Sequence, residues 1–438
     1  MVSTSILLGK RFILFCYALA LALYVTRFLS GADLFGIAAF GLFLLAVGLG
    51  VFKLLVRTPD QNFLLKLWLA ALIVRVLLAI VFDVIVLPRV PSLIEPDAFG
   101  YDRAGWQVTL AWQRNGLGPV PDAGIPYDPG YYYLNAIVYA LVGHYPIALS
   151  VLNAYLGAFL SVLIYLWGER ISGRRQVARW GAVLVAFSPS LIYWTSQNLK
   201  DGCIFIILAT TVLMASRLSV SPNWRDLIFV VAVLLLSASF RLLLLPTLLI
   251  VVVASLAIGL YTKLPRVWFV SLLFTSAVIG FALFQFTFTN QYSMTRGTSP
   301  TLESIVVYRN GGARGVTVLS EIEPSVAGIL TYMPIGLAYY IAGPFPWVMP
   351  TTVRQWGALP EMIVWLAIVP LILIGLVQCL RQARGPGIVI LIYLLLFTLG
   401  TTFQVANMGT LYRMRTQIWI FCFVLAAWGL DYVRAHWR

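Results

Sequence analysis

The chain has 438 residues, of which 61% are hydrophobic and 11% charged, and its formal net charge is +14. About a quarter of the residues in a soluble domain are charged, so this composition excludes an ordinary soluble protein and indicates an integral membrane protein. Nucleic-acid binding is not expected, because no basic run carries interleaved aromatic residues or a known motif.

Apolar stretches of about 20 residues, the length that spans a bilayer, recur along the chain. They predict an all-α fold: a polytopic transmembrane helical bundle of about twelve spanning helices, in which residues 1–438 form a single integral membrane domain. The expected helices run near residues 12–30, 34–52, 65–88, 147–167, 178–196, 202–218, 226–240, 242–260, 267–288, 361–380, 387–404 and 414–433.

The basic residues predict the orientation of these helices. With the N-terminus in the cytoplasm, most lysines and arginines fall in cytoplasmic segments, together with few acids, as the positive-inside rule requires. The C-terminus is then cytoplasmic as well. The outer segments contain no Asn-x-Ser/Thr glycosylation acceptor, which favours a bacterial inner membrane with a periplasmic site.

Two predicted outer loops, residues 88–146 and 289–360, are too long to be simple connections. Long loops on a rigid scaffold are where functional residues concentrate. Each contains an apolar stretch too short to span, at residues 130–142 and 327–342. Their tyrosines suit the headgroup level, so we expect two helices that lie in the membrane interface.

The first outer loop begins with an acidic motif that includes Asp97, Tyr101 and Asp102. If a helix starts near Pro96, Asp97 and Tyr101 share one face. A carboxylate at the membrane surface is a candidate general base. The simpler alternative is a helix N-terminus or a solvated loop that carries acids.

Basic residues at other predicted outer positions are candidate phosphate ligands. Lys200 precedes Asp201 between two spanning helices, and Arg413 and Arg415 stand at the start of the last one. Arg309, in the second outer loop, is a weaker candidate of the same kind. Lysine holds phosphate as a point charge and arginine in a bidentate way. Snorkelling and headgroup anchoring are the simpler alternatives.

Other catalytic chemistries have little support in the sequence. The two histidines, His144 and His436, are too few for a histidine-rich metal site, and they make a Ser-His-Asp triad improbable. The four cysteines lie in or beside apolar runs without metal-type spacing, so we expect them to be buried.

Residues 65–219 resemble a known family through the order of several short motifs. These are Asp97 within residues 96–101, the tyrosine-rich run 127–134, Gly143-His144, Leu152-Asn153-Ala154, the basic turn 170–179, Pro189, Asn198-Leu199-Lys200-Asp201 and, later, Arg413 with Arg415. In this order and topology the chain resembles the GT-C membrane glycosyltransferases, which include the protein O-mannosyltransferases and the aminoarabinose transferase of lipid A.

The resemblance implies an inverting glycosyltransferase that uses a polyprenyl-phosphate sugar as donor and a glycan, lipid or protein as acceptor. It implies Asp97 as general base or acceptor-orienting group, and Lys200, Arg413 and Arg415 as ligands of the donor phosphate. Asp102, Tyr101, Asp201 and Arg309 would be further substrate contacts. The resemblance implies no particular cofactor and leaves a divalent metal ion open. The doublet of adjacent acids found in some members is absent, which weakens the metal expectation.

Three alternatives stay open. An O-antigen ligase or polysaccharide polymerase also works at the outer face with loop arginines, and residues 289–360 would suit it. A transporter or flippase for lipid-linked saccharides would place polar groups near the bilayer midplane, where this chain has few. A structural assembly protein is the third alternative.

Overall fold

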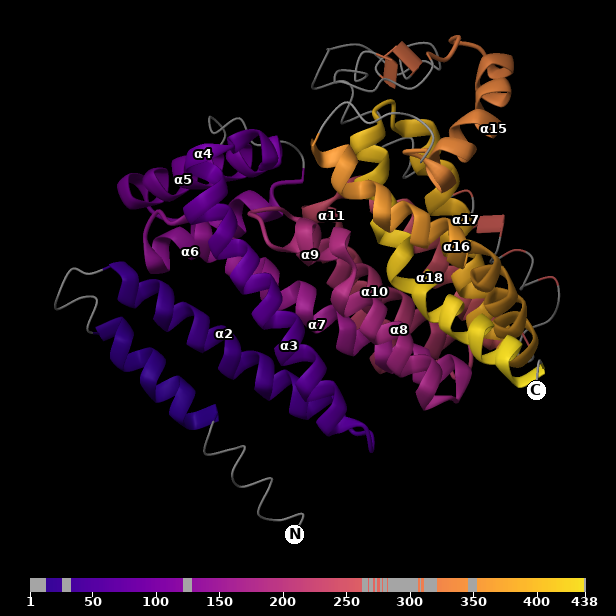
Figure 1. The fold of residues 1–438 in the computed structure, drawn as a ribbon, viewed down its shortest axis with the longest axis horizontal. Coiled ribbons are helices and arrows are strands. Elements are labelled where there is room, and N and C mark those ends of the chain that lie inside the picture. Colours follow the sequence, from indigo (N-terminus) through magenta and orange to yellow (C-terminus); the bar gives the residue numbers. More distant parts are fainter. Residues whose placement is uncertain are drawn as a thin grey trace. The chain divides into compact units, whose positions relative to one another are not determined.

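The computed structural model describes residues 13–25, 33–120, 128–261, 321–345 and 353–436, together with isolated positions between 267 and 310. The regular elements that it describes are helices (Figure 1). Several of them are long and apolar enough to cross a bilayer. The protein is therefore an all-α, polytopic integral membrane protein, as the composition predicts.

The chain divides into two compact units that are each discontinuous in sequence. The first unit comprises Met1–Val162 and Leu191–Cys203, and the second comprises Leu163–Ser190 and Ile204–Arg438. Each unit contains polar residues that the sequence analysis singles out, so each is described by itself.

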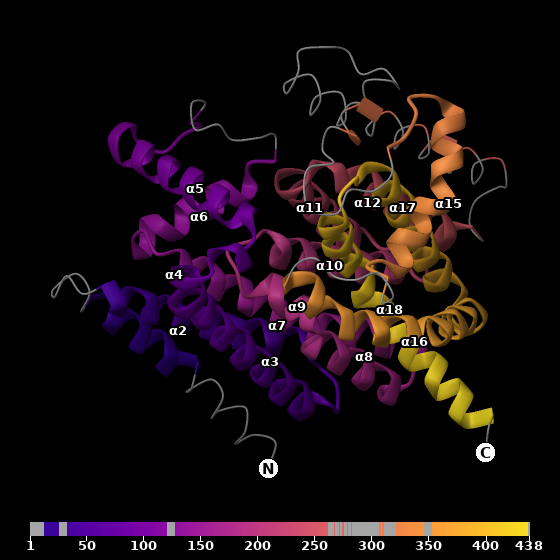
Figure 2. The same cartoon turned by 45° about the horizontal axis from the view of Figure 1, so that its top comes forward.

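The first unit contains two long apolar helices and two shorter amphipathic ones. The long helices are α2 (Asp33–Leu55) and α3 (Gln61–Val81), the second of which continues through η1 (Phe82–Val86) and α4 (Leu87–Arg89). The short turn η2 (Pro91–Leu93) leads to α5 (Pro96–Asn115), and α6 (Gly130–Val142) precedes α7 (Pro146–Ser172). Helices α5 and α6 pack side by side (Figure 2).

Local sequence explains where α5 and α6 begin and end. Pro96 occupies the first turn of α5, where its missing N–H costs nothing, and Asp97 carries negative charge at the positive end of the helix. Gly116 and Gly143 follow the two helices with φ of 81° and 95°, a region that glycine enters without strain. The expected short helix at 130–142 is confirmed, and the one at 327–342 is observed as α15 (Val326–Ala342).

Trp68 on α3 forms the packing centre between the long helices of the first unit. Its indole stacks on Phe52 with ring centroids 5.9 Å apart and meets Phe159 edge to face at 5.8 Å. Gly48 leaves the space for this ring, because a Cβ there would lie 2.8 Å from it. Close packing of this kind drives helix association in lipid, where apolar burial alone gives no advantage.

The second unit contains the remaining long helices. They are α8 (Arg175–Phe187), α11 (Trp224–Phe240), η4 (Leu242–Leu244), α12 (Leu245–Leu260), α15, α16 (Val353–Gln382), α17 (Arg384–Gln404) and α18 (Met408–His436). Helices α7, α9 (Pro189–Thr195) and α10 (Asp201–Leu218) have residues in both units.

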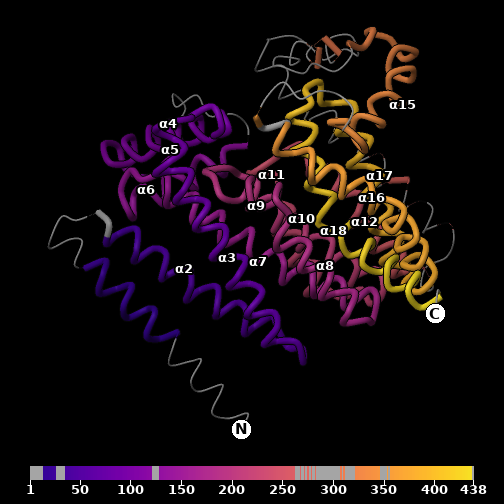
Figure 3. The backbone as a smooth tube through the Cα atoms, viewed as in Figure 1, coloured from indigo at the N-terminus to yellow at the C-terminus, as the bar shows by residue number. Residues whose placement is uncertain are grey.

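Helices α16 and α18 run side by side over much of their length (Figure 3). Two glycines allow their backbones to approach closely. A methyl group added at Gly375 would overlap the Leu425 carbonyl, and one added at Gly429 would overlap the Leu371 carbonyl. Small residues at such crossings are the usual means of helix association in membranes.

The candidate spans within the described residues match most of the predicted ones. The described residues include eight helices that meet the length and hydropathy expected of a span, or nine if α8 and α9, bent by 54° at their junction, form one. The helix Ile13–Val25 has residues outside the described ranges on both sides, and α11 has 17 residues, so neither is among these eight. The predicted span 267–288 lies largely outside the described residues.

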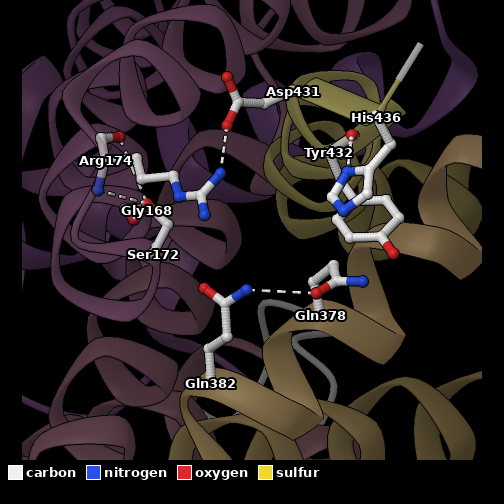
Figure 4. Close-up of polar contacts among 8 residues, drawn as sticks. All are labelled: Gly168, Ser172, Arg174, Gln378, Gln382, Asp431, Tyr432 and His436. Atoms are coloured by element: carbon white, nitrogen blue, oxygen red, sulfur yellow. Dashed lines mark hydrogen bonds and ion pairs between the residues drawn. The ribbon is translucent and has the colours of Figure 1, made fainter. Parts of the chain in front are cut away.

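Two segments predicted to be cytoplasmic, the turn before α8 and the end of α18, come together within the second unit. Arg174, at the start of α8, donates to Asp431 near the end of α18 at 2.6 Å, and Gln382 donates to Gln378 at 3.2 Å (Figure 4). Arg217 pairs with Asp226 at 3.0 Å. These contacts agree with the prediction that the segments share one side, while the side of the membrane that they face stays a prediction.

Candidate active site

The start of α5 holds the acidic motif. The helix begins at Pro96, as predicted, so Asp97 and Tyr101 lie one turn apart on one face. Asp97 is exposed, whereas Tyr101 is buried. The helix therefore presents a carboxylate to the surroundings beside a tyrosine ring that is part of the packed interior.

Lys200 reaches the same aromatic cluster from the chain segment before α10. Its ammonium group lies 5.9 Å from the centroid of the Tyr101 ring and 2.6 Å from a carboxylate oxygen of Asp128. The Tyr101 ring in turn meets the Tyr132 ring at 5.2 Å. The structure thus brings Tyr101 and Lys200, two of the predicted site residues, to one place.

The pKa of Tyr132, a member of this cluster, is affected by the charges of Asp128 and Asp97. Burial, then the charge of Asp128 and then that of Asp97, raise the pKa of Tyr132 to about 12. Both carboxylates therefore act on the tyrosine that touches Tyr101. The Tyr132 hydroxyl stays protonated at neutral pH and can donate a hydrogen bond.

A buried amide network holds the segment that carries Lys200. Tyr131 donates to Asn198 at 2.8 Å, and Asn198 donates to Asn135 at 2.9 Å. Asn153 on α7 donates to the Tyr131 hydroxyl at 3.0 Å and to the backbone carbonyls of residues 197 and 199. The segment is not helical here, so these side chains satisfy backbone groups that a helix would satisfy internally.

Further bonds tie the same segment to the turn that precedes α5. The Gln197 side chain accepts from the backbone N–H of Glu95 at 2.9 Å, and the Tyr193 hydroxyl donates to the Leu93 carbonyl at 2.6 Å. The position of Lys200 is therefore coupled to the position of the α5 N-terminus through defined hydrogen bonds, and not through a flexible loop.

Asp102 takes part in a different cluster. It lies five residues after Asp97, which turns it about 140° away around the helix axis. One of its carboxylate oxygens accepts from the Tyr139 hydroxyl at 2.6 Å and contacts Nε2 of His144 at 2.8 Å. Burial first, and then Asp102, raise the pKa of Tyr139, so its hydroxyl stays a donor. Asp201 is buried at the first position of α10.

In the second unit, Arg415 is buried among helix ends. Its guanidinium donates to the carbonyls of Tyr339 and Gly343, at the end of α15, and to the sulfur of Met362 at 2.9 Å. It also lies 5.5 Å from the centroid of the Tyr412 ring. Arg413 is buried as well. Arg415 thus joins α18 to the last turn of α15 and to α16 through bonds to backbone carbonyls and a methionine sulfur.

Arg309 lies in the second predicted outer loop, where few residues are described. Its guanidinium lies 4.4 Å from the centroid of the Tyr332 ring on α15 and donates to Asn310 at 2.9 Å. Burial lowers the pKa of Arg309, while Tyr332 opposes this shift. Arg314, another arginine of this loop, lies outside the described residues.

Sequence reasoning missed Glu361, in the N-terminal third of α16. Its carboxylate accepts from the Ser188 hydroxyl at 2.6 Å, from the Ser190 backbone N–H at 3.0 Å and from the Tyr412 hydroxyl at 2.8 Å. An acid at the edge of an apolar span is a signal that could have identified it. His144 was also missed, because a count of histidines does not show that one of them meets Asp102.

The described residues do not fit a resident divalent metal ion. Within the described ranges, no three histidine, cysteine or acidic side chains come together as a ligand set. The four cysteines are free and buried, as expected. The carboxylates Asp97 and Asp102 lie on different faces of α5.

Comparison with solved structures finds a likeness in fold. No model of a known protein family matches the chain, and no curated protein does either. The chain is similar to the archaeal oligosaccharyltransferase AglB from Archaeoglobus fulgidus, solved with an inhibitory peptide and a dolichol-phosphate. The TM-score is 0.44 at 16% identity, and the likeness covers 86% of this chain and 51% of that one. The chain thus spans about half the length of the archaeal enzyme.

Proposed function

We propose that the protein is a membrane glycosyltransferase that moves a sugar from a polyprenyl-phosphate-linked donor to a hydroxyl acceptor. The reaction takes place at the extracytoplasmic face and inverts the anomeric centre. One observation carries the proposal: Asp97, an exposed carboxylate, stands one helical turn before Tyr101, and the Lys200 ammonium group lies 5.9 Å from the Tyr101 ring. General base and phosphate ligand are the two groups that this transfer needs most.

The step follows from these two groups. The acceptor oxygen bonds to the anomeric carbon of the donor sugar while the bond from that carbon to the phosphate oxygen breaks. The carboxylate of Asp97 takes the acceptor proton, and the electron pair of the broken bond stays on the phosphate. Lys200 stabilises the negative charge that grows there in the transition state. The attraction between a cation and this charge is strong in a site with little water, where the dielectric constant is low.

Asp128 gives Lys200 a counter-ion in the absence of donor. The Lys200 side chain is 12% exposed, so an unpaired ammonium would be costly at this position. In the proposed cycle the donor phosphate replaces Asp128 as partner of Lys200. The hydroxyls of Tyr101 and Tyr132, whose rings are in contact, are placed to hydrogen-bond the donor. Arg309, Arg413 and Asp201 stay candidates for further substrate contacts.

Arg415 has a different role in this proposal from the one that its sequence position suggests. Its guanidinium is engaged with the backbone at the end of α15 and with Met362. Binding of a phosphate would require these bonds to break. The proposal therefore assigns the donor phosphate to Lys200 and gives Arg415 the task of holding α15 against α18.

The direct test is transfer by the purified protein. Wild type, Asp97→Asn and a control, Asp431→Asn, would be incubated in detergent with radiolabelled polyprenyl-phosphate sugars and a lipid extract as acceptor source. Asp431 is an acid near the C-terminal end of α18 and pairs with Arg174. We expect label transfer by wild type and Asp431→Asn and its loss in folded, monodisperse Asp97→Asn. Undiminished transfer by Asp97→Asn would remove Asp97 from the reaction.

A ligase or polymerase is the second candidate, and Arg309 is the observation that favours it. This arginine is held against Tyr332 in the second outer loop. If Arg309→Met abolishes transfer while Asp97→Asn does not, the reaction belongs to that loop. An absence of transfer from every donor tested would contradict both enzyme proposals and favour a transporter.

A further inference from the structure

The turn between α6 and α7 places His144 against α5. Gly143, with its positive φ, ends α6, and the N–H of Tyr145 donates back to the Gly143 carbonyl at 2.9 Å. This tight turn presents the imidazole to Asp102 and to Trp106, one turn further along α5. The His144 and Trp106 rings stack in parallel, with centroids 4.5 Å apart and an interplanar angle of 2°.

The hydrogen bonds of Asp102 define the state of the histidine. Its oxygen Oδ1 accepts from the Tyr139 hydroxyl and from Nε2 of His144. A carboxylate can only accept, so Nε2 carries the hydrogen and, in the neutral ring, Nδ1 carries the lone pair. Within the described residues, neither Nδ1 of His144 nor the second oxygen of Asp102 has a hydrogen-bond partner.

The cluster is accessible and offers acceptors. The His144 and Asp102 side chains are 37% and 26% exposed. Nδ1 and the second carboxylate oxygen both accept hydrogen bonds, and the carboxylate gives the site negative charge. Such a site repels phosphate and other anions and favours a ligand that donates from neutral groups. A pair of neighbouring sugar hydroxyls is a neutral group of this kind.

The stacked rings of Trp106 and His144 add flat aromatic surface beside these acceptors. The face of an aromatic ring carries partial negative charge, and the C–H bonds of a pyranose ring are weakly positive, so the two attract. The structure therefore combines a flat aromatic pair with two hydrogen-bond acceptors, which are the elements that bind an uncharged sugar.

We propose that Trp106, Asp102 and His144 form a binding subsite for a neutral sugar ring that carries two neighbouring hydroxyl groups. A hydroxyl of this pair donates to Nδ1 of His144, the other donates to Asp102, and the ring lies on the aromatic pair. The assignment of this sugar to the acceptor rests on the proposed function. The binding itself does not, because it requires neither the donor nor Lys200.

The test is direct binding of simple glycosides to the full-length protein in detergent micelles. The probes are the methyl glycosides of glucose, galactose and mannose, followed by saturation-transfer difference NMR in the absence of donor. We expect at least one of them to bind wild type. Inorganic phosphate and Zn²⁺ serve as competing probes, since an aspartate and a histidine could also hold a metal ion.

Two variants and a matched control locate the binding. His144→Phe keeps a ring against Trp106 but removes both nitrogens, and Asp102→Asn replaces an acceptor by a donor. We expect each to weaken glycoside binding about tenfold or more, the effect of one lost hydrogen bond to a charged or oriented group. Trp112→Phe is the control, because Trp112 stacks on Tyr133 on the same helix pair, 5.8 Å apart, without a carboxylate or histidine partner.

The outcomes separate this inference from the proposed function. No glycoside binding, undiminished binding by His144→Phe, or displacement of the glycoside by Zn²⁺ at equal concentration would each overturn the subsite, even if the protein transfers sugar. Glycoside binding that depends on His144 in a protein that transfers no sugar would support the subsite and contradict the proposed function. Lys200→Met should bind the glycosides as wild type does.

Discussion

Lys200 in the first unit and Arg415 in the second are both cations at predicted outer helix ends, but their surroundings differ. Lys200 pairs with a carboxylate and lies beside a tyrosine ring. Arg415 is fully buried and bonds backbone carbonyls and a methionine sulfur. A carboxylate partner can be exchanged for a substrate phosphate, whereas the bonds of Arg415 to the backbone of α15 and to Met362 join these helices to α18. Lys200 is therefore better suited to bind a substrate phosphate, and Arg415 is better suited to hold helices together.

The carboxylates show the same contrast. Asp97 is exposed at the start of α5, where a substrate hydroxyl can reach it. Glu361 is surrounded by donors from α9 and α18 and joins these helices to α16. A carboxylate already saturated with hydrogen bonds is poorly suited to take a proton, since those bonds stabilise its charged form. The difference teaches that the partners of a charged group, more than its position along the chain, indicate its task.

The largest expected effect comes from Lys200→Met. We expect transfer to fall about 10³-fold, because the leaving phosphate loses its cation. The thermal unfolding temperature should change little, since Met fills a similar volume. Lys66→Met, on the exposed face of α3, is the control and should keep full activity. Initial rates at saturating donor would measure the effect, and a rate within threefold of wild type would contradict the role of Lys200.

Arg415→Met should act on stability instead. It removes charge-assisted hydrogen bonds to the carbonyls of Tyr339 and Gly343, so we expect a loss of roughly 2–4 kcal/mol in the free energy of unfolding. Arg225→Met, an exposed arginine at the start of α11, should cost far less. Thermal unfolding in detergent would measure both. If Arg415→Met stays as stable as wild type but loses donor affinity, Arg415 is a phosphate ligand after all.

Glu361→Gln should have a smaller effect of the same kind. The amide keeps one acceptor oxygen but cannot serve all the donors from Ser188, Ser190 and Tyr412, so we expect a loss of about 1–3 kcal/mol. Glu169→Gln, at a surface ion pair with Arg175, is the matched control. Donor and acceptor KM should stay unchanged in folded Glu361→Gln. A selective fall in kcat with unchanged stability would instead make Glu361 a participant in the reaction.

The smallest effect is expected for Asn198→Ala. Loss of its bonds to Tyr131 and Asn135 should loosen the segment that carries Lys200 and lower kcat/KM about tenfold. Asn62→Ala, at an exposed position of α3, should leave the rate unchanged. The role is one of positioning, so the loss should appear in both donor KM and kcat. An equal rate in Asn198→Ala would show that the amide network does not hold Lys200.

The sequence by itself determined the positions of most helices and of their ends, because these depend on residues close together in the chain. Runs of apolar residues fixed most spanning helices, because lipid requires each segment to satisfy its own backbone. Pro96 and Gly143 marked the start of α5 and the end of α6 through their restricted and permissive backbones. Eight of the predicted spans, or nine with α8 and α9 taken as one, are found among the described residues.

Tertiary structure alone decided the partners of the charged residues. Lys200 meets Asp128 across 72 residues, His144 meets Asp102 across 42, and Glu361 meets Ser188 across 173. No local pattern encodes these pairs, because they follow from how the helices pack and where each turn directs its side chains. The hydropathy of the sequence predicts that a residue lies at the end of a span. Only the packing of the helices decides which group that residue contacts there. The contacted group then determines whether the residue binds substrate, reacts or stabilises the fold.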